Sequence, residues 1–389
     1  MTLTAEVPAR PADTDACAAA LAESVRERRT LRVRGAATKD YLGELGPADG
    51  VLQTTALTGV VDHVPADLTV TVRAGTRFAD LQAALRTAGQ HVPLDPPHAD
   101  AATVGGIVAA NSNGFGRLRY GGVRHLVIGT TTALTDGTVA HSGGRVVKNV
   151  AGYDLNKLLI GSLGTLGVIT EMTLRVLPLP KARAVAVARC ARAADAFAIA
   201  DALLRTPIRP TALVVVGTRG GWTTVVAAEG EPTAVERAML ETGRAAERSA
   251  AAVDRGDDPD PVLAPLRELP ATATDGVLVR AALPLAAQRS FVDAAAALEA
   301  FEHCITDSGT GTVRIHLRGE EADVLLGADT LMAGARSVGG SARIERRDET
   351  LRGRIAAWGP PPGGAFLMTR IKLAFDPLGT LEPGRGIVR

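Results

Sequence analysis

The stretch Gly161-Ser162-Leu163-Gly164-Thr165-Leu166-Gly167-Val168-Ile169-Thr170 places a glycine at every third position, immediately before an alternating apolar segment. The period-two alternation across 168–176 predicts a strand. Glycine at 164 and 167 predicts a tight turn, because glycine adopts positive φ angles and lets a flat ring or a diphosphate approach the backbone. Taken alone, the pattern favours a packing role over a ligand-binding role.

A second run of small residues follows a strand predicted at 31–33 and reads Arg34-Gly35-Ala36-Ala37-Thr38-Lys39. Successive backbone N–H groups can converge on a phosphate where side chains are small. Thr38 adds a hydroxyl, and Lys39 or Arg34 adds positive charge. The spacing matches neither GxxxxGK[ST] nor GxGxxG. By itself the run therefore favours an ordinary strand–turn connection.

A third glycine-containing region lies between 95 and 117. Thr103 is a suitable N-cap for a helix. Gly105 and Gly106, in the first turn of that helix, leave room either for a ligand or for close packing of the helix on a strand. The sequence leaves these two alternatives open. The polar run Asn111-Ser112-Asn113-Gly114 follows.

The elements around these runs predict an α+β fold. We expect helices at 15–29, 78–88 and 155–160, strands at 60–64 and 68–73, and a hairpin around Asp136-Gly137 that joins 127–134 to 138–141. A hairpin argues against a purely parallel sheet.

Beyond Pro180 glycine becomes rarer and Ala-rich helices alternate with short strands. This alternation predicts a smaller α/β domain with one layer of helices on a sheet. We expect helices at 192–205, 233–250 and 287–301, strands at 211–216, 223–228, 277–283 and 312–318, and a polar loop at 254–261. A proline–glycine linker at 360–364 suggests three segments, 1–180, 181–358 and 359–389. No internal repeat is evident.

Composition narrows the class of protein. The chain has 389 residues with 43 Lys+Arg and 42 Asp+Glu, a balance that argues against coating nucleic acid or an anionic membrane. Cys17, Cys190 and Cys304 lie far apart and form no CxxC pair, so neither a zinc site nor an iron–sulfur cluster is predicted. No signal peptide or membrane span is evident. We expect a cytoplasmic protein, with peripheral membrane attachment through a partner left open.

Taken together and in this order, the three glycine-containing runs resemble the flavin-binding domain of the vanillyl-alcohol oxidase / p-cresol methylhydroxylase superfamily. The similarity extends from about 31 to 180. The closing Phe375-Asp376-Pro377-Leu378-Gly379-Thr380-Leu381-Glu382-Pro383-Gly384-Arg385 resembles the superfamily's C-terminal signature. More narrowly, Pro96-Pro97-His98 and Arg145-Val146-Val147-Lys148-Asn149-Val150-Ala151-Gly152-Tyr153-Asp154 resemble the FAD-binding subunits of bacterial glycolate oxidases.

The resemblance implies an FAD-binding domain of two subdomains, a smaller substrate (cap) domain, and a C-terminal segment that returns to the FAD domain. FAD would lie between the two domains. The implied cofactor contacts are, for the diphosphate, Gly35, Ala36, Ala37, Thr38 and Lys39; along the cofactor, Thr103, Gly105, Gly106, Asn111 and Gly114; and at the adenosine end, Gly164, Gly167, Val168 and Ile169.

Two departures from the superfamily pattern refine these expectations. Members that attach FAD covalently carry a His in the first loop, where this chain has Ala36, Ala37 and Thr38, and no Cys lies within 98–122. The resemblance therefore implies non-covalent FAD. The larger 2-hydroxy-acid dehydrogenases carry a His-rich metal-binding segment. Here only His303 and His316 follow residue 180, and no metal site is predicted.

Oxidation of a 2-hydroxy acid by a flavin requires a cation that holds the carboxylate and a base that accepts the hydroxyl proton. Lys148 and Arg370 are candidate cations. His316 is a candidate base, because it alternates along a predicted strand with Arg314 and Arg318, and these two arginines are candidate carboxylate-binding cations. The alternative for each is a solvent-exposed surface role.

These inferences predict an FAD-dependent subunit that oxidises glycolate or a related 2-hydroxy acid. Electrons would leave through an iron–sulfur subunit towards quinone, because this chain offers no cluster ligands, and a homologous flavoprotein subunit is a further expected partner. Two alternatives are a stand-alone flavin oxidase that uses oxygen, and a flavin-holding scaffold or relay subunit whose homologous partner carries out catalysis.

Overall fold

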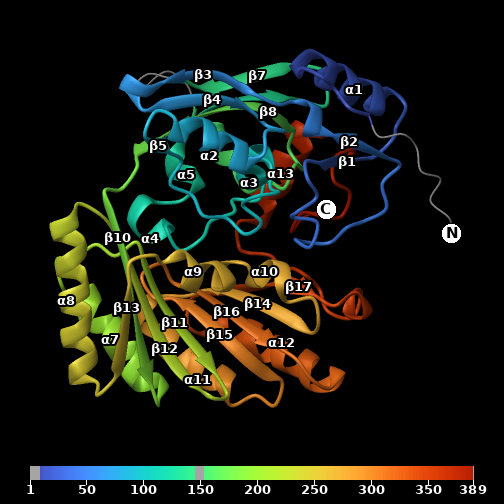
Figure 1. Ribbon diagram of the computed structural model, residues 1–389. Coiled ribbons are helices and arrows are strands. Elements are labelled where there is room, and N and C mark those ends of the chain that lie inside the picture. Colours follow the sequence, from blue (N-terminus) through green and yellow to red (C-terminus); the bar gives the residue numbers. More distant parts are fainter. Residues whose placement is uncertain (1–8, 145–152, 389) are drawn as a thin grey trace. The chain divides into compact units, whose positions relative to one another are not determined.

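The computed structural model describes residues 9–144 and 153–388 (Figure 1). The chain forms two compact units, of which the first contains 1–113, 121–179 and 360–389 and the second contains 114–120 and 180–359. The C-terminal segment is thus part of the first unit. The excursion at 114–120 was not anticipated from the sequence. Within the second unit, Phe115 of this excursion is buried in an apolar cluster, and the Tyr120 hydroxyl bonds Glu229 at 3.1 Å.

The first unit is built on a five-stranded antiparallel sheet with strand order β3-β4-β8-β6-β7. A separate parallel pair, β1 and β2, leads into the first glycine loop. The strands are β1 (Leu31–Arg34), β2 (Gly50–Gln53), β3 (Val60–Val64), β4 (Thr69–Arg73), β5 (Gln90–His91), β6 (Val127–Ala133), β7 (Val139–Gly143), β8 (Val168–Arg175) and β9 (Leu177–Pro178). The helices are α1 (Thr14–Arg26), α2 (Phe78–Arg86), α3 (Val104–Ala109), α5 (Val123–Leu126), α6 (Asn156–Leu159) and α13 (Ala365–Phe375).

Apolar residues at alternate strand positions hold the helices of the first unit on its sheet. Val70 and Val72 of β4 share a buried cluster with Phe78, Leu81 and Leu85 of α2. Successive side chains of a strand point to opposite faces, so the period-two pattern of the sequence fixes which face of β4 receives α2.

The structure confirms one local prediction for the first unit, the hairpin, and corrects another, the length of the first helix. The hairpin is confirmed: Gly137 lies between β6 and β7 with φ +85°, and Asp136 Oδ1 accepts the Thr138 N–H at 2.9 Å. The first helix, expected to reach 29, ends at Arg26. Arg28 has φ +55°, a conformation that cannot continue a right-handed helix.

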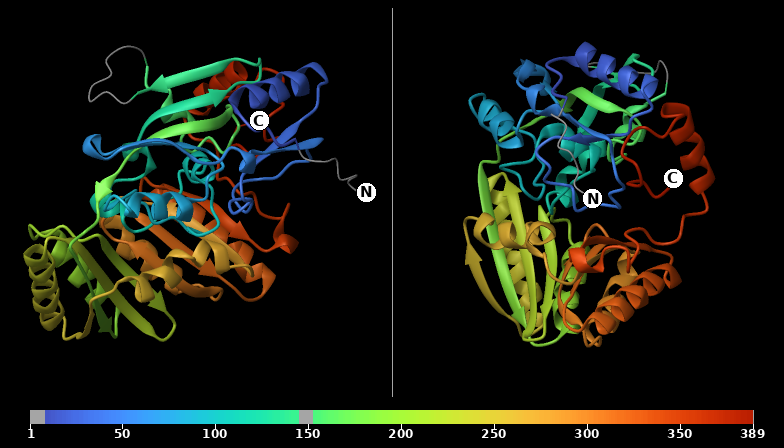
Figure 2. Two further views of the ribbon diagram at one scale, coloured as in Figure 1. Left: turned by 45° about the horizontal axis from the view of Figure 1, so that its top comes forward. Right: turned by 90° about the vertical axis from the view of Figure 1, so that its right-hand side faces the viewer.

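The second unit contains an eight-stranded sheet in the order β13-β10-β12-β11-β15-β16-β14-β17, and each neighbouring pair is antiparallel (Figure 2). The strands are β10 (Ala182–Cys190), β11 (Ala212–Thr218), β12 (Gly221–Gly230), β13 (Ala252–Gly256), β14 (Val277–Ala282), β15 (Phe301–Asp307), β16 (Thr312–Leu317) and β17 (Ser341–Arg347). The helices are α4 (Arg117–Tyr120), α7 (Ala193–Leu204), α8 (Pro232–Arg248), α9 (Asp260–Arg267), α10 (Leu269–Thr272), α11 (Gln288–Ala296) and α12 (Glu321–Ser337).

This sheet consists of two βαββαβ halves. The first runs β10-α7-β11-β12-α8-β13 and the second β14-α11-β15-β16-α12-β17. In each half the first strand lies between the third and the fourth, and the two second strands, β11 and β15, join the halves. Each half has the ferredoxin-like arrangement. The duplication is one of topology, which explains why no repeat was evident in the sequence.

The strand–helix alternation predicted a sheet with one layer of helices and did not predict the strand direction. Leu213 and Val215 of β11 belong to the cluster that contains α7, α8, α11 and α12. Val214, which points to the opposite face, packs with Leu263 of α9 and Leu269 of α10. The second unit therefore has an antiparallel sheet with helices on both faces (Figure 1), rather than a single helical layer.

The loop predicted at 254–261 is shorter in the structure and covers only 257–259. Strand β13 extends to Gly256, and α9 begins at Asp260. As an edge strand, β13 pairs only with β10, and its side chains are largely exposed. Edge strands tolerate charged side chains, so polar composition concealed the strand. The helix expected at 287–301 is also shorter and ends at Ala296.

Candidate functional site

The three small-residue runs meet around one pocket in the first unit. Nine of its twenty lining residues are Gly or Ala, so much of its wall is bare backbone. Twelve predicted cofactor residues line it: Gly35, Ala36, Ala37, Thr38, Lys39, Thr103, Gly105, Gly106, Gly164, Gly167, Val168 and Ile169. Asn111 does not line it, and Gly114 belongs to the second unit.

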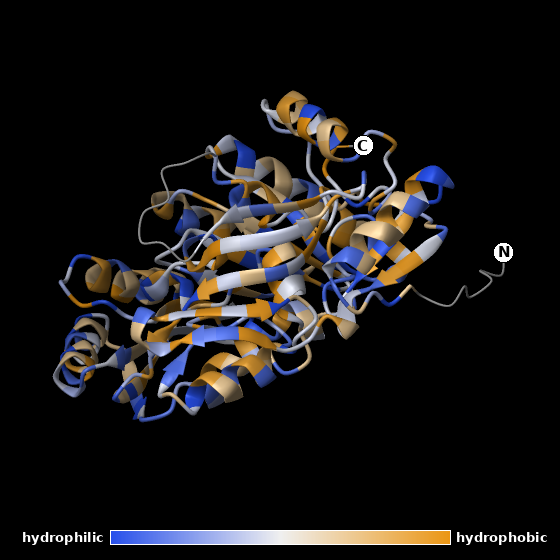
Figure 3. Ribbon diagram, turned by 90° about the horizontal axis from the view of Figure 1, so that it is seen from above, coloured by the Kyte–Doolittle hydropathy of each residue, from blue (hydrophilic) through white to orange (hydrophobic). Residues whose placement is uncertain are grey.

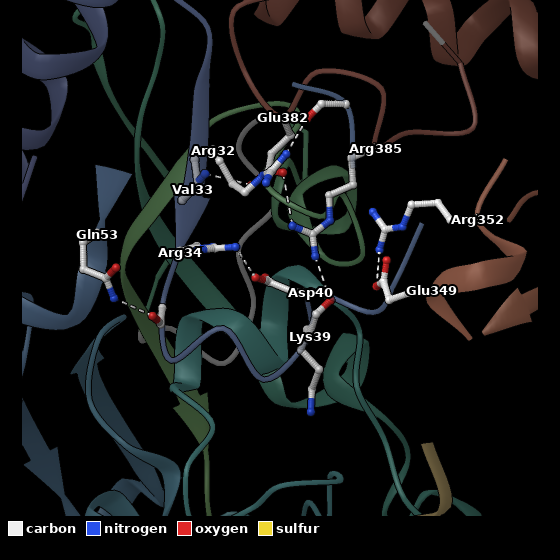
Figure 4. A network of polar contacts seen from close by, with 12 residues as sticks. Arg32, Val33, Arg34, Lys39, Asp40, Gln53, Glu349, Arg352, Glu382 and Arg385 are labelled. Carbon is white, nitrogen blue, oxygen red and sulfur yellow. Dashed lines mark hydrogen bonds and ion pairs between the residues drawn. The ribbon is translucent and has the colours of Figure 1, made fainter. Parts of the chain in front are cut away.

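The loop after β1 forms one wall of the pocket. Ala37 has φ +58°, and a left-handed residue in a short loop turns neighbouring N–H groups towards a common point, which suits an anion. The Gly35 carbonyl accepts a bond of 2.7 Å from Gln53 Nε2 (Figure 4). A Cβ at Gly35 would lie 2.2 Å from Thr103 Oγ1. Glycine at 35 thus lets the first run touch the Thr103 region.

The Thr103 turn forms a second wall. Thr103 caps α3, as predicted, with its Oγ1 accepting the Gly106 N–H at 3.3 Å. Glycine is present at positions 105 and 106 for different structural reasons. A Cβ at Gly105 would lie 2.7 Å from the Ala74 Cβ, so Gly105 serves close helix–strand packing, whereas a Cβ at Gly106 would meet only Thr103 Oγ1, at 3.1 Å. The packing alternative is therefore realised at Gly105, and the space beside Gly106 leaves room for a ligand at that position.

The turn at 161–167 forms a third wall. Gly164 has φ +80°, and the nearest atom to a Cβ there would be Glu382 Cγ at 3.5 Å. Backbone conformation, not space, therefore requires glycine at 164. Gly167 has φ +153°, and a Cβ there would also lie 2.9 Å from Thr132 Cγ2. Val168 then begins β8 beside the pocket.

The C-terminal segment completes the pocket in a way that the sequence did not reveal. Glu382 Oε1 accepts the Val33 N–H at 2.8 Å, and Glu382 Oε2 accepts from Arg385 Nη1 at 3.1 Å. Arg385 Nη2 donates to the Lys39 carbonyl at 2.8 Å (Figure 4). The Glu382–Arg385 pair thus holds both ends of the loop 33–39. Burial raises the pKa of Glu382, and the Arg385 charge opposes that rise.

Positive charge predominates along the pocket lining. Arg34, Lys39 and Arg385 contribute cations, against the single carboxylate of Asp40. Arg34 pairs with Asp40 at 2.7 Å, and Lys39 Nζ donates to the Pro97 carbonyl at 2.7 Å. A cationic lining beside an anion-binding loop fits a diphosphate, and long walls of bare backbone fit a cofactor that packs closely against the chain. The residues present therefore fit a flavin dinucleotide.

A second network fixes the C-terminal segment. Asp376 is buried and accepts bonds of 2.9 Å from the Thr380 N–H and 2.8 Å from the Leu381 N–H. Lys372 Nζ bonds Asp376 Oδ2 at 2.5 Å and the Thr165 carbonyl at 2.9 Å. Burial alone would raise the Asp376 pKa, but these bonds hold it below its usual value. Lys372 thus ties α13 to the turn at 161–167.

The predicted catalytic residues do not gather at this pocket. Lys148 lies outside the described residues. Arg370 is exposed on α13 and does not line the pocket. His316 is buried in the second unit on β16, where its Nε2 lies 2.8 Å from the Asp275 carbonyl. The solvent-facing alternative for His316 is therefore wrong. Arg318 is exposed and pairs with Asp275 Oδ2 at 2.7 Å, and the other carboxylate oxygen of Asp275 lies 3.9 Å from His316 Nε2.

His303 and His316, isolated in the sequence, lie together, because β15 and β16 are paired. Their ring centroids are 5.0 Å apart. Within 9–144 and 153–388, no group of three or more His, Cys, Asp or Glu side chains is placed to hold a metal ion. No helix in the same ranges is long and apolar enough to span a membrane.

The second unit carries a cluster of three arginines around a buried glutamate, Glu345, and the arginine side chains themselves are 14–26% exposed. Arg314 Nε bonds Glu345 Oε2 at 2.6 Å, and Arg280 and Arg343 lie 3.9 and 4.0 Å from Glu345 Oε1. Burial would raise the Glu345 pKa, but the arginines hold it at about 2. Burial and the neighbouring charges of Arg343, Arg314 and Arg117 lower the Arg280 pKa to about 9, with Glu345 opposing. Cations thus predominate around Arg280.

Known proteins share both the sequence and the fold of this chain. Residues 5–143 match the family described as FAD binding domain. The chain is 41% identical over 162 residues to the glycolate oxidase subunit GlcE of Escherichia coli (strain K12), an alignment covering 41% of this chain and 46% of that protein. It is 34% identical over 175 residues to the glycolate oxidase subunit GlcD of Bacillus subtilis (strain 168), covering 44% of this chain and 37% of that protein. The alignments thus span less than half of either relative.

A solved structure of p-cresol methylhydroxylase with substrate bound matches with a TM-score of 0.76 at 16% identity, covering 97% of this chain and 88% of that one. An alkyldihydroxyacetonephosphate synthase matches with a TM-score of 0.73 at 15% identity, covering 96% of this chain and 76% of that one. At these identities the matches establish the fold. The first unit of this chain is therefore an FAD-binding domain of the p-cresol methylhydroxylase type, and FAD is its cofactor.

Proposed function

We propose that the chain is an FAD-dependent oxidoreductase subunit that oxidises glycolate or a related 2-hydroxy acid. The observation that carries this proposal is the pocket of the first unit, much of which is formed by residues within the range 5–143 that matches an FAD binding domain; the likeness of the chain to glycolate oxidase subunits supports it. A further relative is named a D-lactate dehydrogenase, from Arabidopsis thaliana, 38% identical over 177 residues that cover 45% of this chain and 31% of that protein. The substrate class that we propose therefore includes 2-hydroxy acids other than glycolate.

We propose that FAD is held without a covalent bond. Among the described residues, the pocket lining contains no His or Cys side chain that could attach the flavin. The loop 35–39 and the cations Arg34, Lys39 and Arg385 would hold the diphosphate by hydrogen bonds and charge. When bound, FAD supplies the two-electron acceptor for the hydrogen on carbon two of the substrate.

We assign recognition of the substrate carboxylate to the arginine cluster of the second unit. Arg280 has three cationic neighbours and one anionic neighbour, Glu345. A carboxylate beside Arg280 would improve the charge balance of this cluster, and guanidinium groups bind carboxylates with well-defined geometry. This assignment retains Arg314 from the sequence prediction and replaces Arg318, which is exposed, with Arg280 and Arg343.

His316 remains the candidate base, and its hydrogen bonds favour one tautomer. A carbonyl oxygen can only accept, so the bond of 2.8 Å to the Asp275 carbonyl requires the proton on Nε2. Nδ1 then carries the lone pair of the neutral ring. Nδ1 is buried and has no hydrogen-bond partner in the structure. A neutral imidazole with an unbonded nitrogen can accept a hydroxyl proton.

We propose that electrons pass to an iron–sulfur subunit and then to quinone, and that a homologous flavoprotein subunit completes the assembly. The support is that the matched relatives are named as subunits. The second candidate function is a flavin-holding subunit whose partner carries out catalysis. The observation that favours it is the absence of a three-residue metal-ligand group among the described residues.

The test begins with absorbance spectra of the purified chain before and after denaturation. Yellow colour released into the supernatant supports non-covalent flavin. Anaerobic mixing with glycolate, D-lactate or D-2-hydroxyglutarate then follows the flavin band. Bleaching in the isolated chain supports catalysis by this subunit. No bleaching alone but turnover in the assembled complex favours the flavin-holding role, and formation of hydrogen peroxide in air favours a stand-alone oxidase.

A further inference from the structure

Helix α13 presents an apolar surface to solvent. Phe366, Leu367 and Leu373 are 62%, 50% and 57% exposed. The stripe that we call the α13 face contains Phe366, Leu367, Arg370, Leu373 and Ala374, at spacings i, i+1, i+4, i+7 and i+8, which lie on one side of a helix. In Figure 3 the helix next to the C-terminus is coloured mainly as hydrophobic. Clustered exposed apolar side chains on a helix mark interaction sites.

The opposite side of α13 is already fixed to the first unit. Ile371 and Phe375 pack against the main apolar cluster of that unit. The Thr135 hydroxyl donates to the Phe375 carbonyl at 2.8 Å, and Lys372 bonds Asp376 and the Thr165 carbonyl. The helix therefore does not need the α13 face for its own attachment, and the face is available as a preformed surface.

The charge of the α13 face disfavours two of its possible binding partners, a second copy of the chain and an anionic membrane. Arg370 lies in the middle of the stripe, and residues 365–375 contain no acidic residue. A second copy that packed its own α13 face here around a two-fold axis would bring the two Arg370 guanidinium groups together. An anionic membrane surface attracts helices rich in Lys and Arg, whereas this face carries one cation and the whole chain has a net charge of +1. Both occupants are disfavoured.

We propose that the α13 face docks into an apolar groove of a different polypeptide, which places a carboxylate opposite Arg370. This inference rests on the proposed function, in which the chain is one subunit of an oxidoreductase assembly. A helix in a groove uses anchors at i, i+3, i+4 and i+7, and Phe366, Arg370 and Leu373 have that spacing. Because Lys372 bonds the Thr165 carbonyl, the docked helix would be directly tied to the turn at 161–167.

The test uses the full chain co-expressed with the two proposed partner chains from the same genome, the homologous flavoprotein and the iron–sulfur protein. Leu373→Glu and Phe366→Glu replace apolar anchors by carboxylates. Leu326→Glu is the matched control, because Leu326 is 66% exposed on α12 of the second unit. The measurements are co-purification and size-exclusion chromatography, with flavin content and substrate-induced bleaching of each isolated chain.

We expect Leu373→Glu and Phe366→Glu to weaken assembly at least about tenfold, as expected for an interface anchor, while Leu326→Glu assembles as the wild type does. Arg370→Glu should weaken assembly and Arg370→Lys should largely retain it. The isolated Leu373→Glu chain should keep its flavin and its bleaching, so failure of the proposed function would appear in that measurement and not in assembly.

Four results would overturn the proposal. The first is assembly of Leu373→Glu and Phe366→Glu at wild-type affinity. The second is failure of the wild-type chain to form a complex with either partner chain. The third is a homodimer of the isolated wild-type chain that Leu373→Glu abolishes, which would assign the face to a second copy. The fourth is co-sedimentation with phosphatidylcholine–phosphatidylserine vesicles that Leu373→Glu abolishes.

Discussion

The pocket of the first unit and the arginine cluster of the second unit are built by opposite means. Nine of the pocket's twenty lining residues are Gly or Ala, which leave backbone exposed to the pocket. The cluster consists of four long charged side chains on three strands, β14, β16 and β17. Adding a side chain should weaken ligand binding at a site walled by backbone. Removing one charge should destabilise a site built from charged side chains. The following substitutions and one pH series test these two kinds of site, beginning with the largest expected effect.

Glu345→Gln removes the buried carboxylate at the centre of the cluster and leaves three half-buried arginines facing one another. Breaking a buried ion pair in this way costs about 3–5 kcal/mol. We expect the free energy of unfolding of the second unit, measured with urea at pH 7, to fall by that amount. Glu349→Gln is the surface control, because its carboxylate is 79% exposed and pairs with Arg352; it should change stability by less than about 1 kcal/mol. Equal losses in the two variants would contradict this interpretation of the cluster.

The same carboxylate predicts a pH dependence. The pKa of Glu345 is lowered from 4.5 to about 2 in the folded protein, so the ionised group stabilises the fold above pH 4.5. This contribution is lost as the pH falls from about 4.5 to about 2, and amounts to about 3 kcal/mol at 1.36 kcal/mol per unit. Urea denaturation across this range should show a steeper loss for the wild type than for Glu345→Gln. Parallel curves would show that another group dominates.

Gly35→Ala tests the pocket that is walled by backbone. The added Cβ would lie 2.2 Å from Thr103 Oγ1, so the loop or Thr103 must move. We expect FAD affinity to fall by about 2 kcal/mol, a typical cost of overpacking, measured by flavin fluorescence on titration. Gly363→Ala is the matched control, because a Cβ there meets no atom within 4 Å. Unchanged flavin affinity in a folded Gly35→Ala protein would remove 35–39 from the cofactor site.

Gly164→Val tests the effect of backbone conformation at a position where there is space for a side chain. Space is adequate, but φ +80° is unfavourable for a β-branched residue, at a cost of about 1–3 kcal/mol. We expect a lower melting temperature and a smaller FAD-induced gain than in the wild type. A ligand that binds only the native state adds about 2.7 kcal/mol at a hundredfold excess over Kd. A variant that melts early yet keeps this full gain would show that the turn serves packing only.

Glu382→Gln gives the smallest effect. The amide oxygen can still accept the Val33 N–H, but the charge pair with Arg385 is lost. We expect FAD affinity to fall by about 1 kcal/mol, the scale of one hydrogen bond, with faster flavin release in stopped-flow experiments. Glu382→Ala, which loses both contacts, should release flavin faster still. Identical release rates for all three proteins would show that the C-terminal segment does not support the loop.

The backbone site was more predictable from sequence than the side-chain site. Small residues in turns leave a local signature, so twelve predicted cofactor residues could be named and the structure brings them to one pocket. The arginine cluster leaves none, because Arg280, Arg314 and Glu345 become neighbours only through strand pairing. The solvent-facing alternative for His316 was wrong for a related reason: alternation with arginines resembled an exposed strand, whereas His316 is buried beside the paired strand β15 and Asp275.

The glycine turns, the Thr103 cap and the β6–β7 hairpin could be predicted from the sequence, because each depends on residues close together along the chain. The flavin-binding type of the first unit followed from the resemblance over 31–180. Tertiary structure alone decided the antiparallel order of the eight-stranded sheet, the contact of the Glu382–Arg385 pair with loop 33–39, and the assembly of the arginine cluster. These depend on residues tens to hundreds of positions apart. Their pairing is fixed only when burial of the apolar faces selects one arrangement of strands and helices.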